Sequence, residues 1–354
     1  MIKSYSYAPL INIRRNTYYS FIVSSLFSIL VFCLFACTAG QQYKKTTSVL
    51  DDPAFVKDFN ALSVYAVAPA SGSTQNFIEK IVQLRAAISF YLPDDSILID
   101  ASPYHSNSDS ERGRLLSEAL NDAHSHIIWA LNGGYGSARL YDLLPANPIP
   151  PKQKLIIGYS DITALHLMAA KWGWKSIWGP ILSDLNSPAK DPQNFYLIMD
   201  ILHKRITEIN YSGLYPLNRP AKDSGTIEGY LTGGTLTLVT NSLGTPWQID
   251  AHNKILFLED RGEKGYAVDR YFNHLKQAKI FEKVNAVILG CFTDGDKNVE
   301  YALKRFADES DIPVFKADFF GHGQKNYPLI YGAKGRIVLS GEVYSLNFSL
   351  EDLN

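Results

Sequence analysis

Short apolar runs alternate with amphipathic segments between residues 62 and 194. The runs at 62–69, 126–131 and 154–157 have the length and β-branched content of buried parallel strands. The segments 76–87 and 111–123, which stand between runs of this kind, carry apolar residues at the spacing of one helical face. Strands that alternate with helices in this way predict a parallel sheet with helices on both faces.

The pattern changes after residues 216–225, a segment rich in proline, asparagine, lysine and aspartate that is typical of a linker. Beyond it, apolar runs at 226–231, 254–260 and 284–289 indicate strands, and we expect a helix at 268–278. This second part of the chain has the composition of an α+β domain.

The fold class that follows is α/β, divided between two domains. We expect an N-terminal parallel-sheet domain over 61–215 and a smaller C-terminal α+β domain over 226–354. A chain of 354 residues agrees with about two domains of ordinary size. Because ligands bind beyond the carboxyl ends of strands in open α/β sheets, we expect the chemistry in the loops at those ends.

Residues 1–36 have the pattern of an export signal. A basic leader precedes an almost unbroken apolar run at 18–35, and the small residue Ala36 precedes Cys37. Cys37 is placed like the lipidated cysteine of bacterial lipoproteins, and a plain cleaved signal or an uncleaved membrane anchor are the alternatives. Each places the body of the protein outside the cytoplasm, in the periplasm or at the membrane, with 37–60 as a polar tether.

Charge and cysteine content narrow the choice of function. The chain has 34 Lys and Arg against 35 Asp and Glu, with no arginine-rich stripe, so we expect no nucleic-acid partner. Of its three cysteines only Cys291 lies beyond residue 37, so the mature body cannot form an internal disulfide. No spacing of histidines and cysteines matches a metal site, and we expect neither a metal nor another cofactor.

Ser160 is the first candidate for chemistry. It follows the buried strand and Gly158, and a helix is expected to begin at Ser160 or Asp161. A serine on a sharp strand-to-helix turn exposes its hydroxyl over the positive end of the helix, as a nucleophile requires. The alternative is an ordinary helix cap, because serine is a common capping residue and Ile162 replaces the second glycine of G-x-S-x-G.

Three other places could support a nucleophile. The loop 132–136 contains three glycines after a strand, which indicates either a tight turn or backbone amides aimed at an oxyanion. Glu259 ends an apolar strand, and His322 lies between two glycines. Taken alone, each of these two residues also fits an ordinary charged residue at the surface.

Five motifs, in their order along the chain, are similar to those of one enzyme family. They span roughly residues 62–348, and the chain resembles the LD-carboxypeptidases, serine peptidases that include the microcin C self-immunity proteins. The ordered set is specific, and its motifs lie at 132–140 (NGGYGSARL), 158–164 (GYSDITA), 233–236 with 244–247 (GGTL, GTPW), 257–260 with 269–270 (FLED, DR) and 318–322 (DFFGH).

The resemblance implies a flavodoxin-like or glutamine-amidotransferase-like N-terminal domain and a catalytic triad divided between the two domains. Ser160 would be the nucleophile and His322 would carry its proton, while Glu259 would orient the imidazole. The backbone amides of Gly134 and Asp161 would bind the oxyanion.

As a substrate the resemblance implies a murein tetrapeptide, which would lose its terminal D-alanine at an L,D-amide bond. Gly133, Tyr135 and Arg139 would contact this substrate, and a homodimer is implied. Two alternatives stay open: hydrolysis of a microcin C-like peptide-nucleotide, and non-catalytic binding of muropeptides at the envelope. Thr235 departs from the family's usual asparagine, and we expect it to alter the cleft wall and not the triad.

Overall fold

The computed structural model describes residues 48–84, 90–91, 102–144, 150, 152–351 and 353. The predicted export segment 1–36 and the first part of the predicted tether, 37–47, lie outside the described residues, and so does Cys37. Within the described residues, no helix has both the length and the apolar content needed to cross a membrane.

The predicted parallel sheet is confirmed. Among the described residues, five parallel strands are arranged in the order β2-β1-β3-β4-β5, which is the strand order of flavodoxin-like folds, and β11 joins β5 as an antiparallel edge strand. The strands are β1 (Val64–Val67), β2 (Phe90–Tyr91), β3 (Ile127–Ala130), β4 (Leu155–Gly158), β5 (Ser176–Trp178) and β11 (Leu329–Tyr331).

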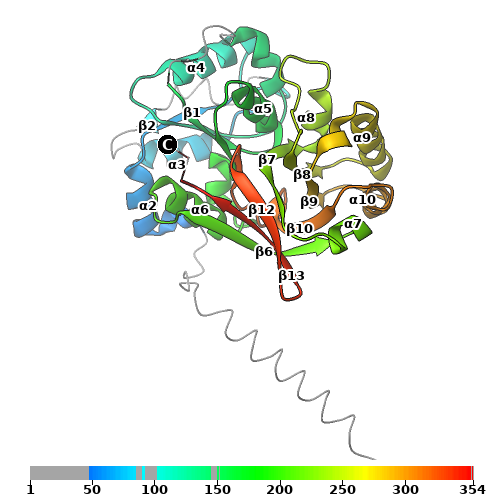
Figure 1. Ribbon diagram of the computed structural model, residues 1–354. Coiled ribbons are helices and arrows are strands. Elements are labelled where there is room, and N and C mark those ends of the chain that lie inside the picture. Colours follow the sequence, from blue (N-terminus) through cyan, green and yellow to red (C-terminus); the bar gives the residue numbers. More distant parts are fainter. Residues whose placement is uncertain are drawn as a thin grey trace, which may run out of the picture. The chain divides into compact units, whose positions relative to one another are not determined.

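Helices cover this sheet on two sides, with α4 and α5 on one side and α2 and α6 on the other (Figure 1). Buried side chains from the strands form a continuous core with these helices, which is the usual arrangement for a parallel sheet. The helices are α2 (Pro53–Asn60), α3 (Gln75–Leu84), α4 (Asp109–Asn121), α5 (Thr163–Lys171) and α6 (Gln193–Leu202), with short 3-10 helices at η1 (Val49–Asp51), η4 (Ser137–Leu143), η5 (Ser160–Ile162) and η6 (Leu182–Asn186).

The C-terminal part is a closed barrel of seven strands in the order β10-β6-β13-β12-β7-β8-β9. Parallel pairing joins β7, β8, β9 and β10, and antiparallel pairing joins the others. The elements are β6 (Glu208–Pro216), α7 (Arg219–Lys222), β7 (Ile227–Thr235), α8 (Leu236–Asn241), β8 (Lys254–Arg261), α9 (Gly265–Gln277), η7 (Ile280–Lys283), β9 (Ala286–Thr293), α10 (Val299–Asp308), β10 (Val314–Gly321), β12 (Lys334–Ser340) and β13 (Val343–Ser349).

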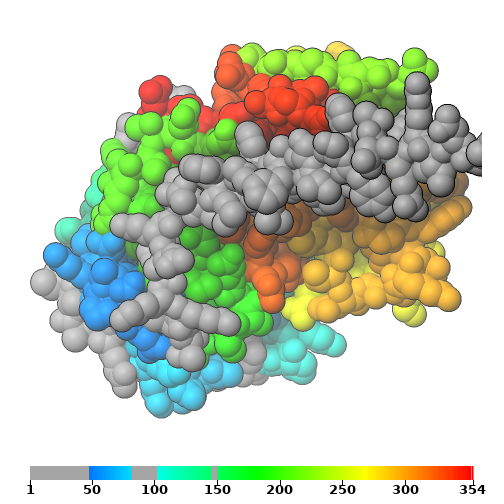
Figure 2. All heavy atoms as spheres, turned by 90° about the horizontal axis from the view of Figure 1, so that it is seen from below, coloured from blue at the N-terminus to red at the C-terminus, as the bar shows by residue number. Residues whose placement is uncertain are grey.

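The end of the predicted tether is part of the folded body. Residues 48–60 contain η1 and α2, and Phe55 and Phe59 on α2 are 2% and 3% exposed. Asp52 caps α2 by accepting a hydrogen bond from the amide of Ala54. Figure 2 shows this blue segment packed beside green parts of the chain. The tether prediction fails here because two phenylalanines four residues apart give one apolar face to a segment that is otherwise polar.

The two sheets divide the chain differently from the predicted boundaries. Strand β6 ends at Pro216 and pairs with β13 and β10, so 208–216 belongs to the barrel and not to the first sheet. The predicted linker 216–225 contains α7, which is held by Asn218: its side-chain amide donates to the carbonyl oxygens of Ala307 and Ile312. Strand β11 returns from the C-terminal part to the first sheet. Each sheet is therefore completed by residues distant in sequence.

Candidate active site

Ser160 occupies a strained elbow between β4 and the helical turn η5. Its φ is +63°, in the left-handed region that a residue with a side chain adopts at a cost in free energy. Tyr159 stands at the N-cap position of η5, and no side chain caps that turn. A Cβ at Gly158 would lie 2.9 Å from the side chain of Ile162, so the turn is too tight for a larger residue. This geometry is that of a nucleophile elbow and not of a helix cap.

The structure brings Ser160, His322 and Glu259 together. The Nε2 atom of His322 lies 2.9 Å from Oγ of Ser160, and its Nδ1 atom lies 2.5 Å from Oε2 of Glu259. Glu259 is on β8, and His322 follows β10 directly. Glu259 is 0% exposed and the His322 side chain is 7% exposed, so the two groups meet away from bulk water.

The partners of His322 define its tautomer. A carboxylate can only accept, so Nδ1 carries the proton and donates it to Glu259. The lone pair of Nε2 is then free to accept the hydroxyl proton of Ser160. This arrangement can activate a serine nucleophile without any other group.

Two residues that the sequence did not indicate hold the histidine loop. Lys190 donates from Nζ to the carbonyl oxygens of His322 and Gly323, at 3.3 and 2.9 Å. The ring of Tyr159 lies beside the imidazole, with 5.0 Å between the ring centroids, and Lys190 lies 5.2 Å from the Tyr159 ring centroid. Lys190 and His322 are 132 residues apart, so no local motif could reveal this contact.

The glycine loop lies against the elbow. A Cβ at Gly133 would lie 3.1 Å from Cβ of Ser160, and a Cβ at Gly134 would lie 2.1 Å from Oγ of Ser71. Gly134 also has a φ of +105°. The predicted oxyanion amides of Gly134 and Asp161 are therefore carried by two segments that meet at Ser160, and their role stays a prediction.

Side chains fix this loop to the rest of the sheet edge. The buried carboxylate of Asp161 accepts the amide of Ser137 at 2.7 Å, and burial raises the pKa of Asp161. The buried guanidinium of Arg112 donates to the carbonyl oxygens of Pro69 and Gly136. The sequence did not indicate Arg112, because its contacts with Pro69 and Gly136 join residues 43 and 24 positions apart and follow no local spacing.

Two of the predicted substrate-contact residues, Tyr135 and Arg139, differ in how freely they could bind a substrate. Tyr135 is 52% exposed, and its ring lies 5.4 Å from that of His105 and 6.4 Å from that of Tyr104, measured between centroids. Arg139 already binds Asp109, with its Nε and Nη2 atoms 2.8 and 2.6 Å from Oδ2. A substrate carboxylate would have to compete with Asp109 for Arg139. The substrate role of these residues stays a prediction.

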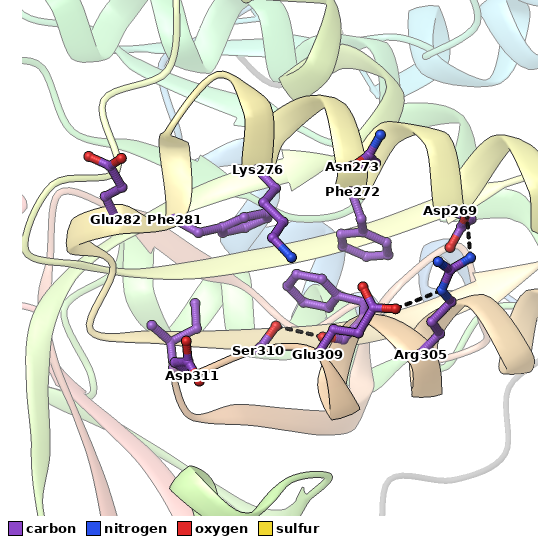
Figure 3. A pocket seen from close by; sticks show the side chains of 12 residues that line it. Asp269, Phe272, Asn273, Lys276, Phe281, Glu282, Arg305, Glu309, Ser310 and Asp311 are labelled. Atoms are coloured by element: carbon purple, nitrogen blue, oxygen red, sulfur yellow. Dashed lines mark hydrogen bonds and ion pairs between the residues drawn. The ribbon is translucent and has the colours of Figure 1, made fainter.

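A separate cavity of about 460 Å³ lies between α9 and α10 (Figure 3). Its floor is formed by Phe272, Phe281 and Phe306, with the rings of Phe272 and Phe306 stacked at 4.1 Å between centroids. Charged side chains such as Lys276 and Glu309 surround this floor. No triad residue lines the cavity, so it does not belong to the site described above.

His166, within the elbow motif, is a structural core residue. Its Nε2 donates to the carbonyl oxygen of Gly158 at 2.9 Å, and its Nδ1 accepts from Oγ of Ser176 at 2.8 Å. The ring stacks on Tyr331 of β11 with 4.6 Å between centroids. Burial lowers the pKa of His166 to about 4, so the imidazole that supports the strand before Ser160 is neutral at physiological pH.

We expect His166 to make the protein sensitive to acid. Its pKa of about 4 in the folded state is below the ordinary value of 6.5, so the unfolded chain binds the additional proton between these values. The free energy of unfolding should therefore fall as the pH falls from 6.5 to 4, by about 3 kcal/mol from this residue. Urea unfolding across this range should give a smaller dependence on pH in His166→Gln. The same slope in both proteins would contradict this prediction.

Two family models match the chain. The model of the LD-carboxypeptidase N-terminal domain matches residues 64–179, and the model of the C-terminal domain matches residues 228–337. A Rickettsia conorii protein described as a candidate carboxypeptidase is 39% identical over 320 residues, which is 90% of this chain and 96% of that protein. The murein tetrapeptide carboxypeptidase of Pseudomonas aeruginosa is 29% identical over 241 residues, covering 61% of this chain and 76% of that protein.

Solved structures share the fold. The muramoyltetrapeptide carboxypeptidase from Oxalobacter formigenes matches with a TM-score of 0.69 at 24% identity, covering 81% of this chain and 98% of that one. The microcin C7 self-immunity protein, solved with glutamyl sulfamoyl guanosine, matches with a TM-score of 0.66 at 24% identity, covering 81% and 96%. The division into a parallel-sheet part and a β-rich C-terminal part is thus common to these proteins and to this chain.

Proposed function

The chain belongs to the LD-carboxypeptidase family of serine peptidases, and we propose that it hydrolyses the L,D-amide bond of murein tetrapeptides and releases the terminal D-alanine. The observation that supports this most directly is the hydrogen-bonded series from Ser160 through His322 to Glu259. A relative of this chain and a structural neighbour are named for murein tetrapeptides, which favours that substrate.

In the proposed first half-reaction, Oγ of Ser160 attacks the carbonyl carbon of the L-residue, and its proton passes to Nε2 of His322. The amides of Gly134 and Asp161 stabilise the negative oxygen of the tetrahedral intermediate, and Glu259 stabilises the imidazolium. His322 then gives its proton to the amine of D-alanine as the C–N bond breaks. The shortened peptide remains as an ester on Ser160.

In the second half-reaction, water attacks the ester and His322 accepts its proton. When the second tetrahedral intermediate breaks down, the proton returns to Oγ of Ser160 and the peptide leaves with a new carboxylate. The elbow favours this series of steps because it holds the hydroxyl of Ser160 in one direction beside the glycine loop.

The experiment uses the full chain in detergent and a purified disaccharide tetrapeptide. We expect the substrate to lose the mass of one D-alanine residue, with free D-alanine appearing at the same rate. No loss from this substrate, together with cleavage of a processed peptide-nucleotide, would favour the microcin-type alternative. Saturable binding of the muropeptide without cleavage of either compound would favour the non-catalytic alternative and contradict the proposal.

We also propose that the protein is exported and anchored by lipid at Cys37, in the periplasm or at the membrane. The basic leader, the apolar run and Cys37 support this, and they come from the sequence alone. Mass spectrometry of the mature protein should find an acylated cysteine as its first residue. A mature terminus without an acyl-modified cysteine would exclude lipidation. A homodimer, which the resemblance implies, can be checked by sedimentation of the same sample.

A further inference from the structure

Both oxygens of the Glu259 side chain accept hydrogen bonds from other side chains. Oε2 accepts from His322, and Oε1 accepts from the hydroxyl of Thr235 at 2.7 Å. Glu259 is 0% exposed and Thr235 is 5% exposed, so water has little access to replace a missing donor. Without the Thr235 hydroxyl, Oε1 would be a buried acceptor that had lost this partner, and the carboxylate could turn about its last torsion.

Thr235 is also connected to the nucleophile. Its backbone amide donates to Oγ1 of Thr163 at 3.1 Å, and that hydroxyl donates to the carbonyl oxygen of Ser160 at 2.7 Å. The hydrogen bonds therefore form a ring that leaves Ser160 through its side chain and returns to it through its backbone. This ring connects the elbow of the first sheet with the barrel strands β7 and β8, which carry Thr235 and Glu259.

The close approach of the two parts depends on Gly234. A Cβ at this position would lie 2.5 Å from Cγ2 of Thr163, and its φ is +124°. A larger residue would push β7 away from the elbow and lengthen the bond between Thr235 and Thr163. The backbone before Thr235 is thus shaped for this contact. The expectation that Thr235 alters only the cleft wall is wrong, because its hydroxyl binds Glu259 directly.

We propose that Thr235 is a positioning residue for the triad: its hydroxyl fixes the direction of the Glu259 carboxylate, and its amide, through Thr163, couples that carboxylate to the backbone of Ser160. The proposal rests on the proposed function for the roles of Ser160, His322 and Glu259. It assigns no contact with substrate to Thr235, so loss of the hydroxyl should act on the chemical steps and not on substrate binding.

The test compares Thr235→Val, which keeps the shape of the side chain, with Thr235→Ser, which keeps the hydroxyl. We expect Thr235→Val to lower kcat by about 10- to 100-fold with little change in KM. The acid limb of its kcat/KM profile should move to higher pH, because a carboxylate with one donor fewer stabilises the imidazolium more strongly. Thr235→Ser should restore most of kcat and the position of the limb.

Thr237→Val is the matched control. Thr237 donates from Oγ1 to the neighbouring carboxylate of Asp260 at 2.8 Å, so this variant loses a similar bond two residues away. We expect it to keep kcat within about threefold of the parent, because neither Thr237 nor Asp260 lies in the hydrogen-bonded ring. Thermal unfolding of all variants separates loss of fold from loss of positioning. If Thr235→Val does not fold, the comparison is made between Thr235→Ala and Thr235→Ser.

A second readout does not depend on the natural substrate. A small fluorophosphonate should label Ser160 in the parent, and it should label Thr235→Val about 10-fold or more slowly, because the reagent reports how well His322 is oriented to accept the hydroxyl proton of Ser160. If muropeptide is not cleaved but this difference in labelling remains, the proposed function fails and the positioning role stands. Equal labelling of folded Thr235→Val and parent would overturn the positioning role. Three other results would also overturn the positioning role. These are an effect of Thr235→Val on KM alone, a loss of kcat in Thr235→Ser equal to that in Thr235→Val, and labelling of the parent that is no faster than labelling of Ser160→Ala.

Discussion

Replacement of Ser160 by alanine should reduce hydrolysis of the disaccharide tetrapeptide by about 10⁴- to 10⁶-fold. The substitution removes the only atom that His322 can activate in this position, at 2.9 Å from Nε2. The backbone should stay in place, because Thr163 continues to bind the carbonyl oxygen of residue 160. Release of D-alanine should be measured at a high enzyme concentration, so that the residual rate can be compared with the rate without enzyme.

A second substitution at the same place separates the chemistry from the strain. Alanine at a φ of +63° is strained like serine, whereas glycine is not, so Ser160→Gly should be about 1 kcal/mol more stable than Ser160→Ala. Both should be inactive. Ser224→Ala, which removes a hydroxyl bound to the carbonyl oxygen of Ala221, serves as the control with normal activity. Turnover within about tenfold of the parent in folded Ser160→Ala would end the nucleophile assignment.

The local parts of the site are readable in the sequence. The apolar strand, the glycine and the polar helix start at 154–163 predict the elbow, because each of these features acts on its neighbours in the chain. The glycine loop at 132–136 is readable for the same reason. The local pattern leaves open whether Ser160 is a helix cap or a nucleophile, since this depends on His322, which is 162 residues away.

The supporting residues could not be predicted because their meaning depends on tertiary contacts. Thr235 is a small polar residue at the end of a strand, and only the register of β7 with β8 places it opposite Glu259. Lys190 reaches the histidine loop from a different part of the chain. A threonine or a lysine has no spacing that distinguishes a partner of the active site from an ordinary surface residue.

In the fold, too, local features could be predicted from the sequence and long-range pairings could not. The parallel sheet follows from alternating strands and helices, and its predicted class is confirmed. The barrel does not follow, since it is closed by strand pairs such as β6 with β13 and β10 with β6, whose register is set over long separations. Strand β11 is only three residues long and completes the first sheet from the far end of the chain. No local pattern assigns so short a strand to a sheet.

The buried pair of carboxylates at the end of β8 has a consequence that can be measured. Burial and the neighbouring Glu259 raise the pKa of Asp260 to about 7. The folded state therefore holds a proton on Asp260 that the unfolded chain has lost, and this contribution makes the protein less stable as the pH rises from about 4 to 7. Any substitution that neutralises Glu259 should weaken this dependence, because it removes one of the two causes.

Replacement of Glu259 by glutamine should lower kcat by about 10³- to 10⁴-fold without unfolding the protein. If the amide nitrogen faces Nδ1 of His322, it imposes the tautomer whose Nε2 already carries a proton and cannot accept that of Ser160. If the amide oxygen faces Nδ1, the tautomer is right but no negative charge balances the imidazolium, so the barrier still rises. Both arrangements keep a hydrogen bond to Thr235, whose hydroxyl can donate or accept.

Two measurements check this prediction together. D-alanine release gives kcat, and urea unfolding at pH 5 and pH 7 gives the stability of parent and variant. We expect Glu259→Gln to be nearly inactive and to lose less stability than the parent between these two values, because the pKa of Asp260 falls when its charged neighbour is removed. A variant that keeps more than about a tenth of the parent kcat would show that Glu259 is not needed to orient or balance His322. An unchanged pH dependence would show instead that burial alone sets the pKa of Asp260.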